Sequence, residues 1–249
     1  MSEGGGDAEG PFLFELNELV SGYAGRPVIR TQHLELAPGE VLAMVGRSGA
    51  GKSTLLATLS GSLPPISGTV RFQGKEVDTP WLSQNVARTL QSFPLLHWRT
   101  VRGNLELAAQ IRGAQNIDAL AILKRFSADG FADKFPPNIS GGQRARASLA
   151  QAAVTRPKLL LLDEPLTGLD PIVKRSVAEA LFTFAREENA AVMFVTHDLL
   201  DALRYCGRVA AVSSAGPVAV ISEIVHSDTP DAEARVLSCP PSAPLRQVG

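Results

Sequence analysis

The chain has 249 residues, of which 45% are hydrophobic and 20% charged, and its formal net charge is −1. This composition is typical of a folded globular protein, and it argues against a disordered chain or a broadly basic nucleic-acid-binding protein. Two cysteines and four scattered histidines argue against a disulfide framework or a zinc cluster, and every apolar run is far shorter than the roughly 18 residues that span a bilayer.

The first part of the chain predicts strands. Residues 1–10 are acidic and rich in glycine, without the apolar core of a signal peptide, so we expect a flexible N-terminus on a cytosolic chain. Apolar and polar residues alternate over 12–17 and 28–36, which is typical of half-buried antiparallel strands. Residues 38–46 are apolar almost throughout, as in the buried strands of parallel sheets, and a further short strand is expected over 69–73.

The middle of the chain predicts helices. From about 76 to 156, apolar residues recur at helical spacing, for example in VRGNLELAAQIRG and NIDALAILKRF. Ser140 and Gln143 fit the S-x-x-Q capping box, so a helix is expected to begin there. Glycine costs about 1 kcal/mol relative to alanine in a helix interior, yet Gly141 and Gly142 follow at once. Bare backbone N–H groups at a helix start favour an anion, which predicts a binding role for these glycines.

Buried strands return in the last part of the chain. Residues 158–165 (KLLLLDEP) and 191–196 (AVMFVT) are both strongly apolar. Between them, residues 171–188 predict a helix with Pro171 at its first position, after the capping residue Asp170. Because buried strands alternate with helices, the expected fold class is α/β, with a mostly parallel sheet and antiparallel strands near the N-terminus.

The domain organisation follows from the same pattern. We expect one domain over residues 11–225, with the helical subdomain of about 76–156 inserted in its core. Residues 226–249 are rich in proline and serine, which predicts a loosely packed C-terminal tail.

A phosphate loop carries the strongest functional signal. The segment GRSGAGKS at 46–53 matches G-x-x-x-x-G-K-[ST] in full and lies between a buried strand and a helix, so the core is expected to be a P-loop NTPase. Its glycines allow backbone N–H groups to face phosphates. Lys52 is expected at the β- and γ-phosphates, and Ser53 on Mg²⁺. The expected cradle consists of Gly46, Arg47, Ser48, Gly49, Ala50, Gly51, Lys52, Ser53 and Thr54.

Two carboxylates follow the second buried strand. Asp163 stands where an aspartate holds Mg²⁺ through its water shell. Glu164, the next residue, is expected to polarise a water for attack on the γ-phosphate. The alternative is a plain strand end, but the phosphate loop in the same chain favours the functional interpretation.

From about residue 12 to 225, these motifs together resemble the nucleotide-binding subunit of an ATP-binding-cassette (ABC) transporter. The segment ISGGQ (139–143) is similar to the signature motif of that family, and LLLLDEP (159–165) resembles its Walker B strand. GLD (168–170) is similar to its D-loop, and THD (196–198) contains the counterpart of its switch histidine. Other positions that match the family are Gln91, at the place of the Q-loop glutamine, and Tyr23, at the place of the adenine-stacking aromatic residue.

The resemblance implies a role for each of these residues. Cassettes of the family pair head to tail as ATP-dependent homodimers, so Ser140, Gly141 and Gly142 would contact the γ-phosphate of the ATP held by the partner. His197 would contact the γ-phosphate of its own chain's ATP. The remaining implied roles are Mg²⁺ binding and coupling for Gln91, an interface contact for Asp170, and stacking on adenine for Tyr23.

The residues alone leave simpler alternatives open. Asp170 fits a plain helix cap, and His197 fits a solvated loop histidine. Tyr23 fits a packing residue at a strand end, and Gln91 fits an ordinary loop residue.

By resemblance, the expected function is ATP hydrolysis, with Mg²⁺ as cofactor, that powers transport through separate permease subunits at the cytoplasmic face of the cell membrane. PLLHWRTVRGNLEL (94–107) resembles the importer branch for nitrate, sulfonates and taurine, which implies a substrate-binding protein as a further partner and no nucleic acid. The alternatives are the motor of an exporter or a soluble cassette ATPase. The soluble types fit less well, since the chain shows no heptads and carries one cassette.

Overall fold

The computed structural model describes residues 12–89, 95–114, 117–213, 218–229, 231–237 and 246–247. Across these ranges, no helix combines the length and the apolar character that crossing a membrane requires.

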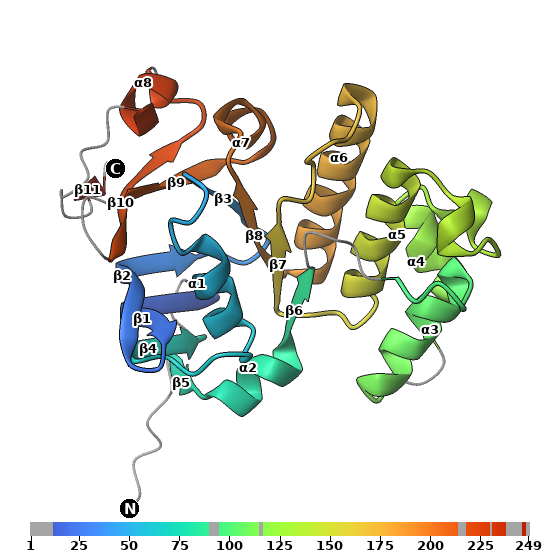
Figure 1. Ribbon diagram of the computed structural model, residues 1–249, viewed down its shortest axis with the longest axis horizontal. Helices are drawn as coiled ribbons and strands as arrows, with labels where there is room; N and C mark the ends of the chain where they lie inside the picture. The colour runs from blue at the N-terminus through green and yellow to red at the C-terminus, as the bar shows by residue number, and fades with distance from the viewer. Residues whose placement is uncertain are drawn as a thin grey trace, which may run out of the picture.

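One sheet runs through the described part of the molecule (Figure 1). Its strand order is β5-β4-β1-β2-β10-β9-β3-β8-β7-β6, and β11 pairs with β10. In chain order the strands are β1 (Phe14–Tyr23), β2 (Arg26–Leu36), β3 (Val41–Gly46), β4 (Ser67–Phe72), β5 (Lys75–Val77), β6 (Val86–Thr89), β7 (Leu159–Asp163), β8 (Ala191–Thr196), β9 (Arg208–Ser213), β10 (Ala219–His226) and β11 (Arg246–Gln247).

The N-terminal strands form an antiparallel part of the sheet. β1 pairs antiparallel with both β2 and β4, and β4 pairs in the same way with β5. Leu16 and Leu34 face each other across the first pair and are fully buried, whereas Glu35 is only partly buried. The alternating pattern of residues 12–17 and 28–36 therefore predicted these antiparallel strands correctly.

The other half of the sheet is parallel. β9, β3, β8, β7 and β6 run in the same direction and pair in that order. Every residue of β7 and β8 is buried, as is every residue of β3 except Gly46. The apolar runs at 38–46, 158–165 and 191–196 thus predicted the central strands, because a strand covered on both faces needs apolar side chains on both.

Helices cover both faces of the parallel strands. They are α1 (Lys52–Leu59), α2 (Thr79–Asn85), α3 (Val101–Ile111), α4 (Ala119–Arg125), α5 (Gly141–Ala153), α6 (Pro171–Glu188), α7 (Leu199–Tyr205) and α8 (Ala232–Leu237), with two 3₁₀ turns, η1 (Asp129–Phe131) and η2 (Pro136–Asn138). In Figure 1, α3, α4 and α5 gather at one end of the molecule, beyond α6 and away from the antiparallel strands.

Two apolar cores lie on opposite faces of the parallel strands. Leu159 and Leu161 point to the face that packs on α1 and the antiparallel strands. Leu160 and Leu162 point to the other face, which packs on residues of α3, α5, α6 and α7. The end of β7 is therefore fixed from both sides, and so is any polar residue that directly follows it.

Some elements lie where the sequence pattern indicated other structure. β6 lies in the stretch of 76–156 that was expected to be mainly helical, because four residues are too few to show a period of two. The strand is held by its backbone pairing with β7. Helix α8 lies within 226–249, where only a loose tail was expected.

Candidate functional site

The phosphate loop joins the end of β3 to α1. Gly49 and Gly51 have φ angles of +79° and +80°, a conformation that glycine adopts without strain. Gly51 is the N-cap of α1, and no side chain caps this helix, so its first N–H groups face outward for an anion. The other side chains of the cradle divide by exposure: Arg47, Ser48 and Ser53 are exposed, whereas Ala50, Lys52 and Thr54 are buried.

Lys52 folds back onto the loop. Its side-chain Nζ donates to the carbonyl oxygens of Gly46 at 2.6 Å and Arg47 at 2.9 Å. Burial lowers the pKa of Lys52, and the nearby carboxylates of Glu164 and Asp163 act in the opposite direction. The ammonium group of Lys52 therefore contacts the loop carbonyls and is also attracted by the negative charges of Asp163 and Glu164.

Asp163 ends β7 and has two polar partners. The Ser53 hydroxyl donates to Asp163 Oδ2 at 2.9 Å. Nη2 of Arg88, on the neighbouring strand β6, lies 3.4 Å from the same oxygen. Two of the three residues expected at Mg²⁺, Ser53 and Asp163, are thus in direct contact.

Glu164 is held at three points directly after β7. Its φ angle is +54°, and its amide donates to the Val195 carbonyl at 2.9 Å. Thr167 Oγ1 donates to Glu164 Oε2 at 2.7 Å, and His197 Nδ1 lies 2.8 Å from Oε1. His197 directly follows β8, so neighbouring parallel strands bring Glu164 and His197 together at one edge of the sheet.

The start of α5 carries the predicted capping box. The amide of Gln143 donates to Ser140 Oγ at 3.3 Å, and the amide of Ser140 donates to Gln143 Oε1 at 2.9 Å. A Cβ added at Gly142 would lie 3.2 Å from Val173 of α6, but one added at Gly141 would meet nothing within 4 Å. Packing therefore accounts for Gly142 and gives no reason for Gly141.

This helix start lies away from the phosphate loop of the same chain. Figure 1 shows α5 on the far side of β6 and β7 from α1. Ser140 and Gly141 are both exposed, as a contact surface for another molecule requires.

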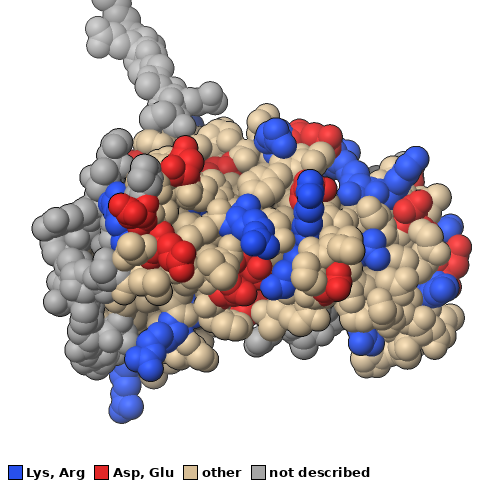
Figure 2. Space-filling model, turned by 90° about the horizontal axis from the view of Figure 1, so that it is seen from above, with Lys and Arg blue, Asp and Glu red and all other residues tan. Residues whose placement is uncertain are grey.

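Asp170 shows the simpler feature that the sequence left open, and Tyr23 does not. Asp170 caps α6 by accepting a hydrogen bond from the amide of Ile172 at 2.9 Å. Tyr23 ends β1 with 55% of its surface exposed, so its ring is accessible rather than packed in a core. On the face of the molecule that Figure 2 shows, acidic and basic side chains are interspersed, and neither charge dominates.

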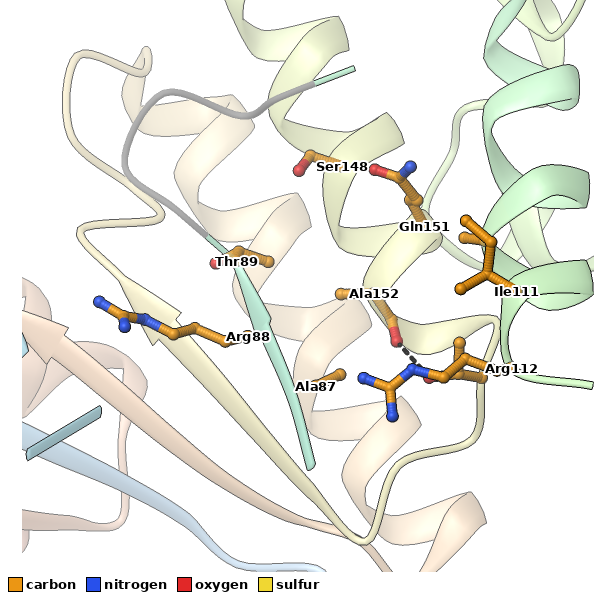
Figure 3. Close-up of a pocket in the computed structure, with 10 residues that line it drawn as sticks. Ala87, Arg88, Thr89, Ile111, Arg112, Ser148, Gln151 and Ala152 are labelled. Atoms are coloured by element: carbon orange, nitrogen blue, oxygen red, sulfur yellow. Dashed lines mark hydrogen bonds between the residues drawn. The ribbon is translucent and has the colours of Figure 1, made fainter. Parts of the chain in front are cut away.

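Gln91 lies outside the described residues. The described strand before it, β6, borders a pocket shared with α3 and α5, whose lining includes Ser148, Gln151 and Ile111 (Figure 3). Trp98, which comes shortly before α3, is 70% exposed. Its ring is therefore a surface feature rather than part of a buried core.

Two residues at the site were not expected from the sequence. Thr167 holds the Glu164 carboxylate, and its place three residues later in the turn was the available signal. Arg88 contacts Asp163, but no sequence pattern indicated this contact, because it depends on the pairing of β6 with β7.

The comparisons with known proteins agree with this geometry. A family model described as "ABC transporter" matches residues 29–167, which is more than half of the chain. The chain belongs to the ABC transporter family. It is an ATP-binding cassette with the expected α/β fold, and the cassettes of this family are ATPases.

Import proteins are among the relatives of this cassette. The taurine import ATP-binding protein TauB of Escherichia coli (strain K12) is 32% identical over 216 residues, which cover 85% of this chain and 84% of TauB. The nitrate import ATP-binding protein NrtC of Synechococcus elongatus is 36% identical over 203 residues. That match covers 79% of this chain but only 30% of NrtC, so the chain spans under a third of that relative.

Solved structures of other cassettes have the same fold. The structure of cbiO1 from Clostridium perfringens, part of the ABC transporter complex cbiONQ, matches with a TM-score of 0.72 and 25% identity, covering 86% of this chain and 87% of cbiO1. A dimeric post-hydrolysis structure of the cassette MJ0796, bound to ADP and Pi, matches with a TM-score of 0.72 and 23% identity, covering 87% and 99% of the two chains.

Proposed function

We propose that this cassette hydrolyses ATP with Mg²⁺ as the motor of a membrane importer, working as a head-to-tail homodimer. The observation that carries the proposal is the meeting of Lys52, Ser53, Asp163, Glu164 and His197 at the ends of three neighbouring parallel strands. Ends of parallel strands are the usual place for ligands in open α/β sheets.

The residues at this edge fit a magnesium ion that arrives with nucleotide. Mg²⁺ prefers oxygen ligands and usually binds through one or two carboxylates together with phosphate oxygens and waters. Ser53 Oγ and Asp163 Oδ2 supply two such oxygens 2.9 Å apart. No group of three or more His, Cys, Asp or Glu residues suited to a metal occurs in the described part of the chain, so phosphate would complete the ligand set.

Each of the chain's own side chains then has a separate role in hydrolysis. Lys52 stabilises the charge of the β- and γ-phosphates, and Mg²⁺ neutralises their oxygens when bound. Glu164 accepts the proton of the attacking water, whose oxygen bonds to the γ-phosphorus while the bond to the β-phosphate oxygen breaks. His197 orients Glu164 and contacts the γ-phosphate. The distance of 2.8 Å between His197 Nδ1 and Glu164 Oε1 supports the first of these roles. Gln91 completes the proposed metal site, by resemblance to the family.

The second half of each site is proposed to come from a partner cassette. Ser140, Gly141 and Gly142 begin a capped helix that is exposed and lies apart from its own phosphate loop. Such a helix start binds anions well, so it suits the γ-phosphate of a second chain. Asp170 contributes to the same interface from the start of α6, and Tyr23 stacks on adenine.

The transport role rests on the relatives. TauB and NrtC are import ATP-binding proteins for taurine and nitrate, which are both small solutes. We therefore propose import of a small solute of this kind, through permease subunits that hold the cassette at the cytoplasmic face of the membrane, with a separate substrate-binding protein. An exporter motor is the second candidate.

The hydrolytic site is tested with two matched variants. ATP at about a hundred times its Kd is expected to raise the Tm of the wild type by about 5–10 °C. Lys52→Ala is expected to lose this shift. Glu164→Gln is expected to keep it, to lower turnover at least about a hundredfold, and to accumulate as a dimer with ATP on size exclusion. Arg102→Ala, on the helical part of the chain, is the control. Equal turnover in Glu164→Gln and wild type would reject Glu164 as the base.

Import is tested in the host organism. Deletion of the gene is expected to abolish uptake of labelled taurine or nitrate, and the wild-type gene, but not Lys52→Ala, is expected to restore it. Normal uptake together with slower loss of a solute from loaded cells would instead support the exporter.

A further inference from the structure

Arg88 lies beside the carboxylate that the proposed function assigns to the metal. β6 runs parallel to β7, and Arg88 is paired in register with Leu161. Side chains two residues apart in a strand share a face, so Arg88 lies on the same face as Asp163. Figure 3 shows the Arg88 side chain directed away from Ser148 and Gln151, which lie on the other side of β6.

The guanidinium of Arg88 is largely buried and incompletely satisfied. The side chains of Arg88 and Asp163 are 17% and 12% exposed, and Nη2 of the first lies 3.4 Å from Oδ2 of the second. The same oxygen accepts a shorter hydrogen bond from Ser53. Arg88 Nε is buried and has no hydrogen-bond partner among the described residues. A group used only to join two strands would be expected to have its donors paired.

The charge of Arg88 is permanent, because an arginine does not lose its proton in proteins. Its field acts on two opposite kinds of ion. It repels a divalent cation that approaches Asp163, and it attracts the phosphates of ATP. Both effects are strong at this position, because buried charges are screened less than exposed ones.

We propose that Arg88 is a fixed cation of the nucleotide site, which holds Asp163 before nucleotide arrives and reduces the dependence of ATP binding on Mg²⁺. The proposal rests on the proposed function, since it takes Asp163 as the metal-binding carboxylate. In the nucleotide-free cassette, Arg88 offsets the negative charge of Asp163 and Glu164. Phosphates without a metal then enter a site that already contains two cations, Lys52 and Arg88. When Mg²⁺ comes with the phosphates, the repulsion between Mg²⁺ and Arg88 cancels part of the attraction between Mg²⁺ and Asp163.

A purely structural role makes a different prediction. If Arg88 only ties β6 to β7, its loss lowers stability but leaves the ratio of ATP affinities with and without Mg²⁺ unchanged. The metal dependence of binding therefore separates the two roles.

The test uses the full chain and the non-hydrolysable analogue AMPPNP, with binding measured by calorimetry in Mg²⁺ and in EDTA. Arg88→Met and Arg88→Gln remove the charge, and the second keeps a polar group in case the first does not fold. Arg88→Lys restores the charge. Arg208→Met is the matched control, since Arg208 is also largely buried and paired with a carboxylate, Glu40, at 2.5 Å, away from the site.

In the neutral variants, Kd in EDTA divided by Kd in Mg²⁺ is expected to rise at least about tenfold, because two unit charges ~12 Å apart already interact by that factor at an effective dielectric constant near 20, and Mg²⁺ carries two charges. Arg88→Lys is expected to lie close to the wild type, and Arg208→Met to match it. An unchanged ratio in Arg88→Gln, alongside tight binding by the wild type, would overturn this proposal alone. Failure of the wild type to bind the analogue in Mg²⁺ would overturn the proposed function as well.

Discussion

At the residue scale, Glu164 shows how the fold constrains a single polar side chain. Its φ of +54° lies in the left-handed region, which costs a non-glycine residue of order 1–3 kcal/mol. The conformation persists because the amide is tied to Val195 and the carboxylate to Thr167 and His197. The direction of the carboxylate is thus set before any nucleotide is present, which would lower the cost of ordering it during the proposed hydrolysis.

Cys206, in contrast, has its side chain in the apolar core. It is 3% exposed, and burial raises the pKa of its thiol to about 12, with a smaller contribution from Asp201. Because the thiolate is the reactive form, we expect no labelling of native protein by Ellman's reagent at pH 8. The measurement uses Cys239→Ser, which removes the other cysteine, and one thiol is expected to appear in denaturant. Rapid labelling of the native variant would contradict the burial.

The same thiol makes a prediction about alkaline stability. The pKa of Cys206 is higher in the folded chain than its ordinary value of 9.0, so above pH 9 the unfolded chain releases a proton that the folded chain retains. The stability linked to this group is fully present below pH 9 and is lost as pH rises towards 12. Urea titrations at pH 8 and 10.5 are expected to show a smaller alkaline loss in Cys206→Ala than in the wild type.

At the element scale, caps and apolar runs made most of the fold predictable. Helix α6 begins at Pro171 and ends at Glu188, as expected, because Asp170 caps its start and Asn189 ends it in the left-handed conformation. The buried strands β3, β7 and β8 were predicted for a similar reason, since each is a continuous apolar run. β6 was not predicted, because its formation depends on a partner strand about 70 residues away, and a local pattern does not carry that information.

The side chain of Arg112 provides a contact between α3 and α2, which is a feature of the element scale. Arg112 is the C-cap of α3, and its Nη1 donates to the carbonyls of Ser83 at 2.5 Å and Gln84 at 2.8 Å, in the last turn of α2. Nη2 donates to the Val86 carbonyl at 3.3 Å, where β6 begins. A cation suits the free carbonyls at the end of a helix, so Arg112 joins the helical part of the chain to the sheet.

Arg112→Ala is therefore expected to destabilise the chain by about 1 kcal/mol, the usual net value of a hydrogen bond, because solvent screens the charge of the exposed Arg112. The urea midpoint is expected to fall by about 0.3–0.5 M. Arg102→Ala is the control, because its pair with Asp133 is exposed at both ends and such pairs contribute little. Equal midpoints for the two variants would show that the contact of Arg112 is not a structural link.

At the scale of the whole molecule, the fold separates two groups of residues that the proposed function joins. The phosphate loop and the carboxylates lie at one edge of the parallel strands, and the start of α5 lies beyond them (Figure 1). Motif spacing predicted both groups, and strand ends explain how Asp163, Glu164 and His197 come close together. The sequence did not predict that Lys52 folds onto its own loop or that Arg88 joins the site, because both depend on packing between distant segments.

The arrangement predicts that two chains complement each other. One chain carries only Lys52→Ala, and the other carries only Ser140→Arg, which adds bulk and charge at the start of α5. Each homodimer has the same defect in both of its sites and is expected to be inactive. In a mixed dimer, both defects fall in one composite site, and the other site combines an intact phosphate loop with an intact helix start.

A mixed dimer isolated with two different tags is therefore expected to bind about one ATP tightly, and each homodimer none. Nucleotide occupancy is the better measurement, because hydrolysis can require coupling between both sites. If the start of α5 served the nucleotide of its own chain instead, every site of the mixed dimer would contain one defect. No tightly bound ATP in the mixed dimer would then reject the head-to-tail assembly, whereas an occupancy near one per dimer would support it, since only a site shared between chains leaves one copy whole.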